Sequence, residues 1–176
     1  ESMGSMLERT ALSVNVRRRL DFSCTVLDAD GTLIVNAPHQ PVHLGAMGLC
    51  VRAVAEAIEM RPGDVIVTNH PRFGGSHLPD INVITPVHDD DARLVGYVAC
   101  RAHHAEVGGT RPGSMPPDAT TLAEEGVVIM PQRLVDGGVS RFDAFESFMA
   151  SQPRPSRALR DNIADLRAQV AANHHG

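Results

Sequence analysis

Residues 64–104 read DVIVTNHPRFGGSHLPDINVITPVHDDDARLVGYVACRAHH, and this stretch decides the fold. Three apolar runs in and around it predict strands over 64–68, 81–87 and 94–102. Two other segments, 70–79 and 103–118, are too rich in Pro and Gly for regular structure. Long irregular segments inside a compact domain are uncommon and usually functional, so a site is expected where these two segments meet.

The residues on either side of this stretch predict helices and a hairpin. Apolar residues at helical spacing predict four helices: 3–18, one from Leu44 to the stop at Arg61-Pro-Gly63, 142–149, and a last one that Ser156 opens as an N-cap. The turn Asp28-Ala-Asp-Gly31 predicts a hairpin, and the expected remaining strands are 20–27, 32–35 and 127–134. The fold class that follows is α+β, a mixed or antiparallel sheet with flanking helices and site-bearing loops between its strands.

The chain is predicted to divide into a domain over 1–152 and a linker with a C-terminal helix over 153–176. The sequence Pro153-Arg-Pro155 marks the linker. The helix carries an apolar stripe at alternating steps of four and three, made of Leu159, Ile163, Leu166 and Val170. Little chain is left to cover this stripe, so the helix is expected either to fold back onto the sheet or to dock onto a partner.

The composition excludes several classes of function. No apolar run approaches the ~18 to 20 residues of a membrane span. A formal charge of −5, one Tyr and no Trp argue against a nucleic-acid partner. All 16 basic residues are Arg, and without Lys the chain has no Walker-A or Schiff-base lysine, so any ATP has to be activated elsewhere. Cys24, Cys50 and Cys100 are odd in number and lie in apolar stretches, which favours reduced thiols in a cytoplasm.

Histidines and an aspartate in the two irregular segments form the first candidate site. His77-Leu-Pro-Asp80 lies in the first segment and His103-His104 opens the second. Imidazole and carboxylate together suit a divalent cation of borderline hardness, and the strands between them are the right length to bring the segments together. The alternative is that a Pro/Gly-rich loop exposes solvated histidines, and the spacing alone gives the two interpretations about equal weight.

Two other motifs have a functional and a structural interpretation. Asp28-Ala-Asp-Gly-Thr-Leu33 has the form of the first haloacid-dehalogenase motif, which would make Asp28 a nucleophile and Asp30 an acid/base in a phosphatase. The same residues are typical of a plain hairpin turn, which the missing Lys favours. His39-Gln-Pro-Val-His43 places two histidines four apart, but Pro41 prevents the helix that would put both on one face, so a substrate-facing loop is the better interpretation.

Several collinear stretches together resemble the hydantoinase B/oxoprolinase family, which includes 5-oxoprolinases, N-methylhydantoinases, caprolactamase and the acetone carboxylase alpha subunit. The stretches are Arg19–Cys24, Asp28–Gly31, Ala37–Gly45, Gly63–Asp64, Gly74–Asp80, Arg101–Gly109, Pro112–Pro117 and Glu124–Gly126. They cover most of the chain, which matches the N-terminal portion of such subunits.

The resemblance implies a divalent metal site, with Zn or Mn as the ion. The implied ligands are His77, Asp80, His103 and Asp21, and His103 is preferred to His104 because relatives often carry an aromatic residue at the second position. His104, His43 and Glu106 are implied candidates for proton transfer. Family members usually show Asp where this chain has Glu106, which puts the role of that carboxylate in doubt.

The implied function is the hydrolytic part of an ATP-dependent cyclic amide hydrolase acting on a hydantoin, 5-oxoproline or a lactam. A hydantoinase A-type subunit would use ATP and Mg to phosphorylate the amide oxygen, in a hetero-oligomer with this chain. Family subunits are considerably longer, so one alternative is a non-catalytic fragment that binds its partner subunit. The phosphatase interpretation of Asp28 and Asp30 is the other alternative.

Overall fold

The computed structural model describes residues 2–38 and 45–176. Its strands form one seven-stranded sheet in the order β2-β1-β5-β4-β3-β6-β7, and each strand is antiparallel to its neighbours. The strands are β1 (Phe22–Asp28), β2 (Leu33–Pro38), β3 (Val65–Thr68), β4 (Asp80–His88), β5 (Leu94–His103), β6 (Gln132–Asp136) and β7 (Val139–Ser140). The α+β prediction is confirmed, and the sheet is the antiparallel one of the two variants.

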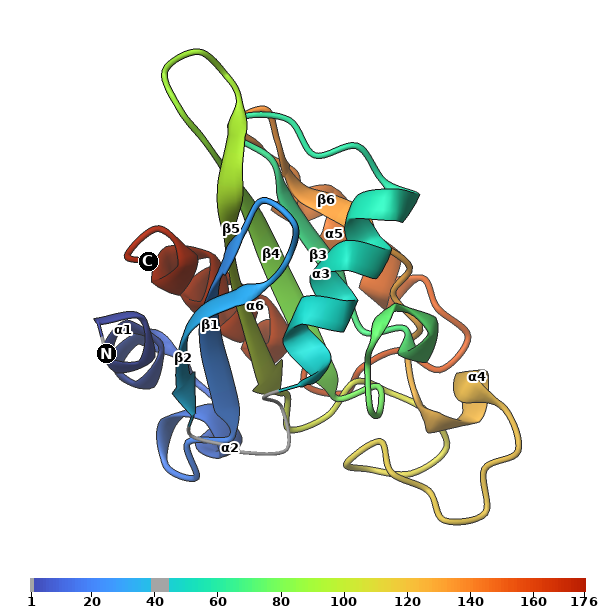
Figure 1. Ribbon diagram of the computed structural model, residues 1–176. Helices are drawn as coiled ribbons and strands as arrows, with labels where there is room; N and C mark the ends of the chain where they lie inside the picture. The colour runs from blue at the N-terminus through green and yellow to red at the C-terminus, as the bar shows by residue number, and fades with distance from the viewer. Residues whose placement is uncertain (1, 39–44) are drawn as a thin grey trace.

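Helices cover both faces of this sheet (Figure 1). They are α1 (Ser2–Thr10), α2 (Val14–Arg17), α3 (Ala46–Ala57), the 3-10 turn η2 (Pro71–Phe73), α4 (Leu122–Glu125), α5 (Phe142–Ala150) and α6 (Leu159–Asn173). Helix α6 lies against β4 and β5 and also packs on α1 and α5, whereas α3 lies on the opposite face with η2. The result is three layers, helix, sheet and helix. Among the described residues, no helix is both long and apolar enough to cross a membrane.

The alternation of side chains along the strands divides the core into two parts. On the α6 face, Phe22, Cys24 and Cys100 pack with the buried residues of α1, α5 and α6. On the α3 face, Leu27 and Ala99 pack with the buried residues of α3. Because neighbouring residues of a strand point to opposite faces, the face of any strand residue follows from these two sets.

The first helix is broken where a single helix over 3–18 was predicted. Helix α1 ends at Thr10, and Ser13 caps α2 by accepting a hydrogen bond from the Val16 amide. The carboxylate of Asp165 on α6 accepts the amides of Leu12 and Ser13, at 2.7 and 3.1 Å. A buried side chain distant in sequence therefore satisfies the amides at the break, which local spacing does not reveal.

Two further boundaries differ from the prediction, and the others agree to within a few residues. The segment predicted as a strand over 127–134 becomes regular only in β6, because the Val127 carbonyl and the Ile129 amide bond the Asn69 side chain instead of a strand. Helix α6 begins at Leu159, and Ser156 lies before its N-cap residue. The predicted hairpin is confirmed by the pairing of β1 with β2.

Helix α6 folds back onto the sheet, which is one of its two expected placements. It buries Ile163 and Leu166 of the predicted stripe. It also buries four polar side chains, Asn162, Asp165, Gln169 and Asn173, which we call the polar stripe. The side-chain amides of Gln169 and Asn173 bond backbone carbonyls of β4 and β5, those of Ile81, Val83 and Val98. The contact between α6 and the sheet therefore includes buried hydrogen bonds as well as apolar packing.

Candidate metal centre

The strand register places Asp80 directly opposite His103. Asp80 is the first residue of β4, His103 is the last of β5, and the two are paired in the antiparallel ladder. Both fall on the α3 face, because Ile81 and Ala102 beside them belong to the core on the α6 face. The His103 Nδ1 atom lies 3.4 Å from Asp80 Oδ1. Two residues separated by a long hairpin thus meet at one end of the sheet.

His77 completes this group from the loop that precedes β4. Its Nδ1 atom lies 3.1 Å from Asp80 Oδ2, so the two histidines approach different oxygens of one carboxylate. The rings of His77 and His103 are edge to face with centroids 4.8 Å apart. The ligand atoms of His77, Asp80 and His103 all lie within 4.8 Å of one another. The structure thereby brings together three of the four ligands that the family resemblance implied.

Asp21, the fourth implied ligand, lies beside this group at the start of β1. Its Oδ2 atom is 4.0 Å from His103 Nδ1, and its backbone carbonyl accepts the His103 amide at 2.9 Å. Its side chain is 30% exposed, whereas that of Asp80 is 2% exposed. Asp21 therefore borders the open side of the cluster, and Asp80 forms its floor.

Charge complementarity within the cluster shifts two pKa values. The hydrogen bond to Asp80 is the main reason that the pKa of His77 is raised; burial opposes it and the charges of Asp80 and Asp21 add to it. Burial by itself would raise the pKa of Asp80, but hydrogen bonds from His103, His77 and Ser76 and the His77 charge together hold it well below its usual range. Asp80 is therefore a carboxylate at neutral pH, and it attracts cations.

The donor set fits a divalent metal ion. Two imidazoles with one or two carboxylates suit Zn²⁺ and similar borderline ions. Donors about 2.1 Å from a tetrahedral ion are about 3.4 Å apart, by simple geometry from typical bond lengths. The ligand atoms of His77, Asp80 and His103 lie within 4.8 Å of one another, so a modest inward movement of these side chains would bring them to that separation. His77, Asp80 and His103 could hold the ion, and Asp21 lies next to them, with Oδ2 4.0 Å from His103 Nδ1.

Buried polar side chains support the His77 loop from below. Arg101, with 0% exposure, donates to Asn82 Oδ1 and to the Gly74 carbonyl, both at 2.7 Å. Asn82 in turn donates to the Thr68 carbonyl at 3.2 Å, where the loop begins. Ser76 donates to Asp80 Oδ2 at 2.9 Å. The roles of Arg101 and Asn82 were not predicted, because a polar residue inside a strand does not reveal which loop its side chain will contact.

His104, a predicted proton-transfer residue, lies on the other face of the sheet. Its ring is fully buried against α6, with Nε2 3.0 Å from Gln169 Oε1 and Nδ1 3.1 Å from Asn162 Nδ2. Burial is the main cause that lowers its pKa. Both ring nitrogens are engaged with α6, so this geometry favours a structural role over proton transfer at the cluster.

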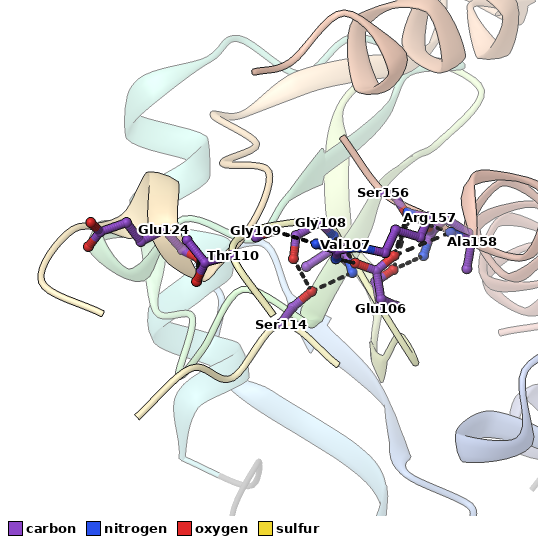
Figure 2. A network of polar contacts seen from close by, with 11 residues as sticks. Glu106, Val107, Gly108, Gly109, Thr110, Ser114, Glu124, Ser156, Arg157 and Ala158 are labelled. Carbon is purple, nitrogen blue, oxygen red and sulfur yellow. Dashed lines mark hydrogen bonds and ion pairs between the residues drawn. The ribbon is translucent and has the colours of Figure 1, made fainter. Parts of the chain in front are cut away.

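Glu106, another predicted proton-transfer residue, holds the start of α6 (Figure 2). Its Oε1 atom accepts from the Gly108 amide and the Arg157 guanidinium, at 2.6 and 2.8 Å. Its Oε2 atom accepts from Ser156 Oγ and the Arg157 and Ala158 amides, at 3.0, 2.6 and 3.2 Å. With five donors around it, the carboxylate connects the segment after His103 to residues 156–158. The third candidate, His43, lies outside the described residues, as does His39.

Residues 28–33, which have the form of the first haloacid-dehalogenase motif, form a plain hairpin turn, the second of their two interpretations. Asp28 Oδ1 accepts the amides of Asp30 and Thr32, at 3.0 and 2.7 Å, within the β1–β2 hairpin. Asp28 and Asp30 are not in the group of ligating side chains found among the described residues. The structural role of a hairpin turn accounts for this motif.

Comparison with known proteins identifies the family. The family model described as Hydantoinase B/oxoprolinase matches residues 1–176. The 5-oxoprolinase of Saccharomyces cerevisiae is 48% identical over 182 residues, which is 99% of this chain and 14% of that protein. 5-Oxoprolinase 1 of Arabidopsis thaliana is 47% identical over 186 residues, covering 100% of this chain and 15% of that protein. The chain therefore belongs to the hydantoinase B/oxoprolinase family.

Solved structures share the fold. The ATP-dependent caprolactamase from Pseudomonas jessenii superposes with a TM-score of 0.83 at 30% sequence identity, over 98% of this chain and 29% of that chain. Acetone carboxylase superposes with a TM-score of 0.84 at 22% identity, over 98% of this chain and 22% of that chain. The chain thus spans between about a seventh and a third of the relatives that it matches, and this family contains ATP-dependent enzymes.

Proposed function

We propose that this member of the hydantoinase B/oxoprolinase family supplies the metal-binding part of an enzyme that hydrolyses a cyclic amide in an ATP-dependent reaction. The observation that carries the proposal is the convergence of His77, Asp80 and His103 on one face of the sheet. The substrate class, a hydantoin, 5-oxoproline or a lactam, is supported by relatives named 5-oxoprolinase and caprolactamase.

His77, Asp80 and His103 would hold a divalent ion, Zn or Mn, with Asp21 as a fourth ligand. Such an ion, when bound, polarises an amide or phosphoryl oxygen and lowers the pKa of water. The residues themselves set the orientation of the site. Asp80 contributes a buried negative charge, while the partly exposed side chains of His77 and Asp21 mark the side open to substrate, at 31% and 30% exposure.

The ATP-dependent step is assigned to a partner, a hydantoinase A-type subunit or domain. An unactivated amide is a poor electrophile, and phosphorylation of its oxygen would create a leaving group. This chain has no Lys to place against a nucleotide phosphate, which supports a division of labour in a hetero-oligomer. Of the three residues predicted for proton transfer, His43 keeps that assignment, and His104 and Glu106 are assigned to holding α6 against the site.

Metal analysis of two variants tests the site. Purified wild-type chain is expected to retain about one divalent ion, and His77→Ala and Asp80→Ala to lose it, because each removes a ligand from a three-residue group. His174→Ala is the matched control, since it removes an exposed imidazole just after α6. Unchanged metal content in both site variants would refute the proposal and favour a non-catalytic, partner-binding role.

A second measurement separates hydrolysis of amides from hydrolysis of phosphate esters. With the partner subunit and ATP, ring opening of 5-oxoproline is expected to be lost in His77→Ala and kept in Asp28→Asn. Phosphate-ester hydrolysis that is lost in Asp28→Asn and kept in His77→Ala would instead support the phosphatase alternative.

A further inference from the structure

Two neighbouring histidines at the end of β5 point to opposite faces of the sheet. His103 faces the metal cluster on the α3 side, and His104 faces α6. Only the peptide bond between them separates a metal ligand from a residue that is fixed to a helix. Any movement of the His104 backbone therefore displaces His103 as well.

The hydrogen bonds around His104 define one arrangement of donors and acceptors. Gln169 Nε2 donates to the Ile81 carbonyl at 3.0 Å, so Gln169 Oε1 faces His104 and accepts from its Nε2–H. Asn162 Nδ2 donates to the Glu106 carbonyl at 2.9 Å and to His104 Nδ1 at 3.1 Å. This assignment follows from the network, and it leaves both ring nitrogens satisfied.

The same network reaches the other ligand segment. The His104 amide donates to the Pro79 carbonyl at 2.8 Å, and Pro79 directly precedes Asp80. Gln169 bonds the carbonyl of Ile81, which directly follows Asp80. Gln169 thus holds the backbone after Asp80 directly. Its partner on the other side of Asp80 is His104, which bonds Pro79 and whose ring Gln169 and Asn162 hold.

We propose that Asn162 and Gln169 are positioning residues for the metal centre, acting from α6 through His104 and Ile81. This inference rests on the proposed function, because it requires that the cluster binds a metal. Residues that orient ligands affect metal affinity almost as ligands do, since a ligand that must be ordered during binding binds less tightly. Glu106 reinforces the arrangement, since four of its five hydrogen bonds come from residues 156–158, just before α6 (Figure 2).

Asn173 provides a matched control on the same helix. It lies one turn beyond Gln169 on the buried polar stripe and donates to the Val83 and Val98 carbonyls, at 3.1 and 3.3 Å. Those carbonyls belong to the middle of β4 and β5, away from the residues of the cluster. A substitution at Asn173 destabilises the contact between α6 and the sheet without touching the ligand segments.

The test compares Zn²⁺ affinity, measured by competition with a chromophoric chelator, in Gln169→Met, Asn162→Leu and Asn173→Leu. All three variants are expected to unfold at lower urea concentration than the wild type. Gln169→Met and Asn162→Leu are expected to bind Zn²⁺ at least about 10-fold more weakly, the usual effect of losing a residue that orients a ligand. Asn173→Leu is expected to bind Zn²⁺ as the wild type does.

Affinity and stability together distinguish the outcomes. If Gln169→Met and Asn162→Leu bind Zn²⁺ as tightly as Asn173→Leu, the positioning role is refuted while the metal site stands. If the wild type binds no Zn²⁺ or Mn²⁺, the proposed function fails and the inference with it. If Asn162→Leu does not fold, Gln169→Met decides alone, because methionine has nearly the volume of glutamine.

Discussion

Replacement of Glu106 by Gln is expected to destabilise the fold by about 2 kcal/mol. The carboxylate accepts two hydrogen bonds at Oε1 and three at Oε2 (Figure 2). A glutamine has one oxygen, and if that oxygen replaces Oε2, its NH₂ group faces the Gly108 amide and the Arg157 guanidinium, which are both donors. An unsatisfied buried donor costs about 1 to 3 kcal/mol. The Arg157 side chain is 46% exposed and turns to water, so most of the loss comes from the Gly108 amide.

Urea unfolding at neutral pH measures this loss, as a lower midpoint with an unchanged slope. In a chain of this size, about 2 kcal/mol also lowers the melting temperature by about 4 to 8 °C. Glu124→Gln is the control: that carboxylate accepts three hydrogen bonds from Thr120 and Thr121, all at Oε2, so the single oxygen of a glutamine can keep them and little change is expected. Equal midpoints for the two variants would show that Glu106 does not anchor α6.

Three other predictions concern pH, thiol reactivity and a helix cap. Because the pKa of His77 is raised in the folded protein, protonated His77 stabilises the metal-free fold. This contribution is complete below about pH 6.5, the pKa of an unfolded histidine, and is lost as pH rises through the pKa of the folded state. The pKa of Asp80 is lowered, so its contribution is lost only in strong acid. Melting curves at pH 6 and 8 should therefore show a larger stabilisation by Zn²⁺ at pH 8, and equal stabilisation at both would contradict the assignment. Burial raises the pKa of Cys24 to about 12 and of Cys50 to about 11, so both thiols should react with Ellman's reagent only after urea is added. Ser13→Ala, which removes the cap of α2, should lower the free energy of unfolding by about 1 kcal/mol in urea titrations, and no change would mean that Asp165 alone fixes the break.

The sequence predicted the elements that position the site. The strands 81–87 and 94–102 correspond to β4 and β5, because long apolar runs between turn residues have few alternative structures. Once those strands pair as a hairpin, the segments before and after them meet, which is why His77, Asp80 and His103 could be proposed as one group. The family resemblance added Asp21, and the structure places it at the neighbouring strand.

Contacts between distant segments could not be predicted in this way. The break before Ser13 depends on Asp165, which lies 152 residues later in the chain. The polar stripe of α6 resembles a solvent-facing surface in the sequence, because Gln169 and Asn173 bond backbone carbonyls, which carry no residue-specific signal. The apolar residues Ile163 and Leu166 indicated which helix face is buried, but not that amides would be buried beside them.

The adjacent residues His103 and His104 face opposite sides of the sheet, and this explains why they have different neighbours. Residues next to each other in a strand face opposite sides, so a metal site on the α3 side can include one of the two histidines and excludes the other. Ala102 belongs to the core on the α6 side, so His103 faces the α3 side, where the proposed metal site lies, and the ring of His104 contacts α6. His104 then meets the amides of Asn162 and Gln169, which accept and donate at its two nitrogens as a neutral imidazole requires. His104 resembles a second metal ligand in the sequence. In the structure it connects α6 to the neighbouring His103, the proposed ligand.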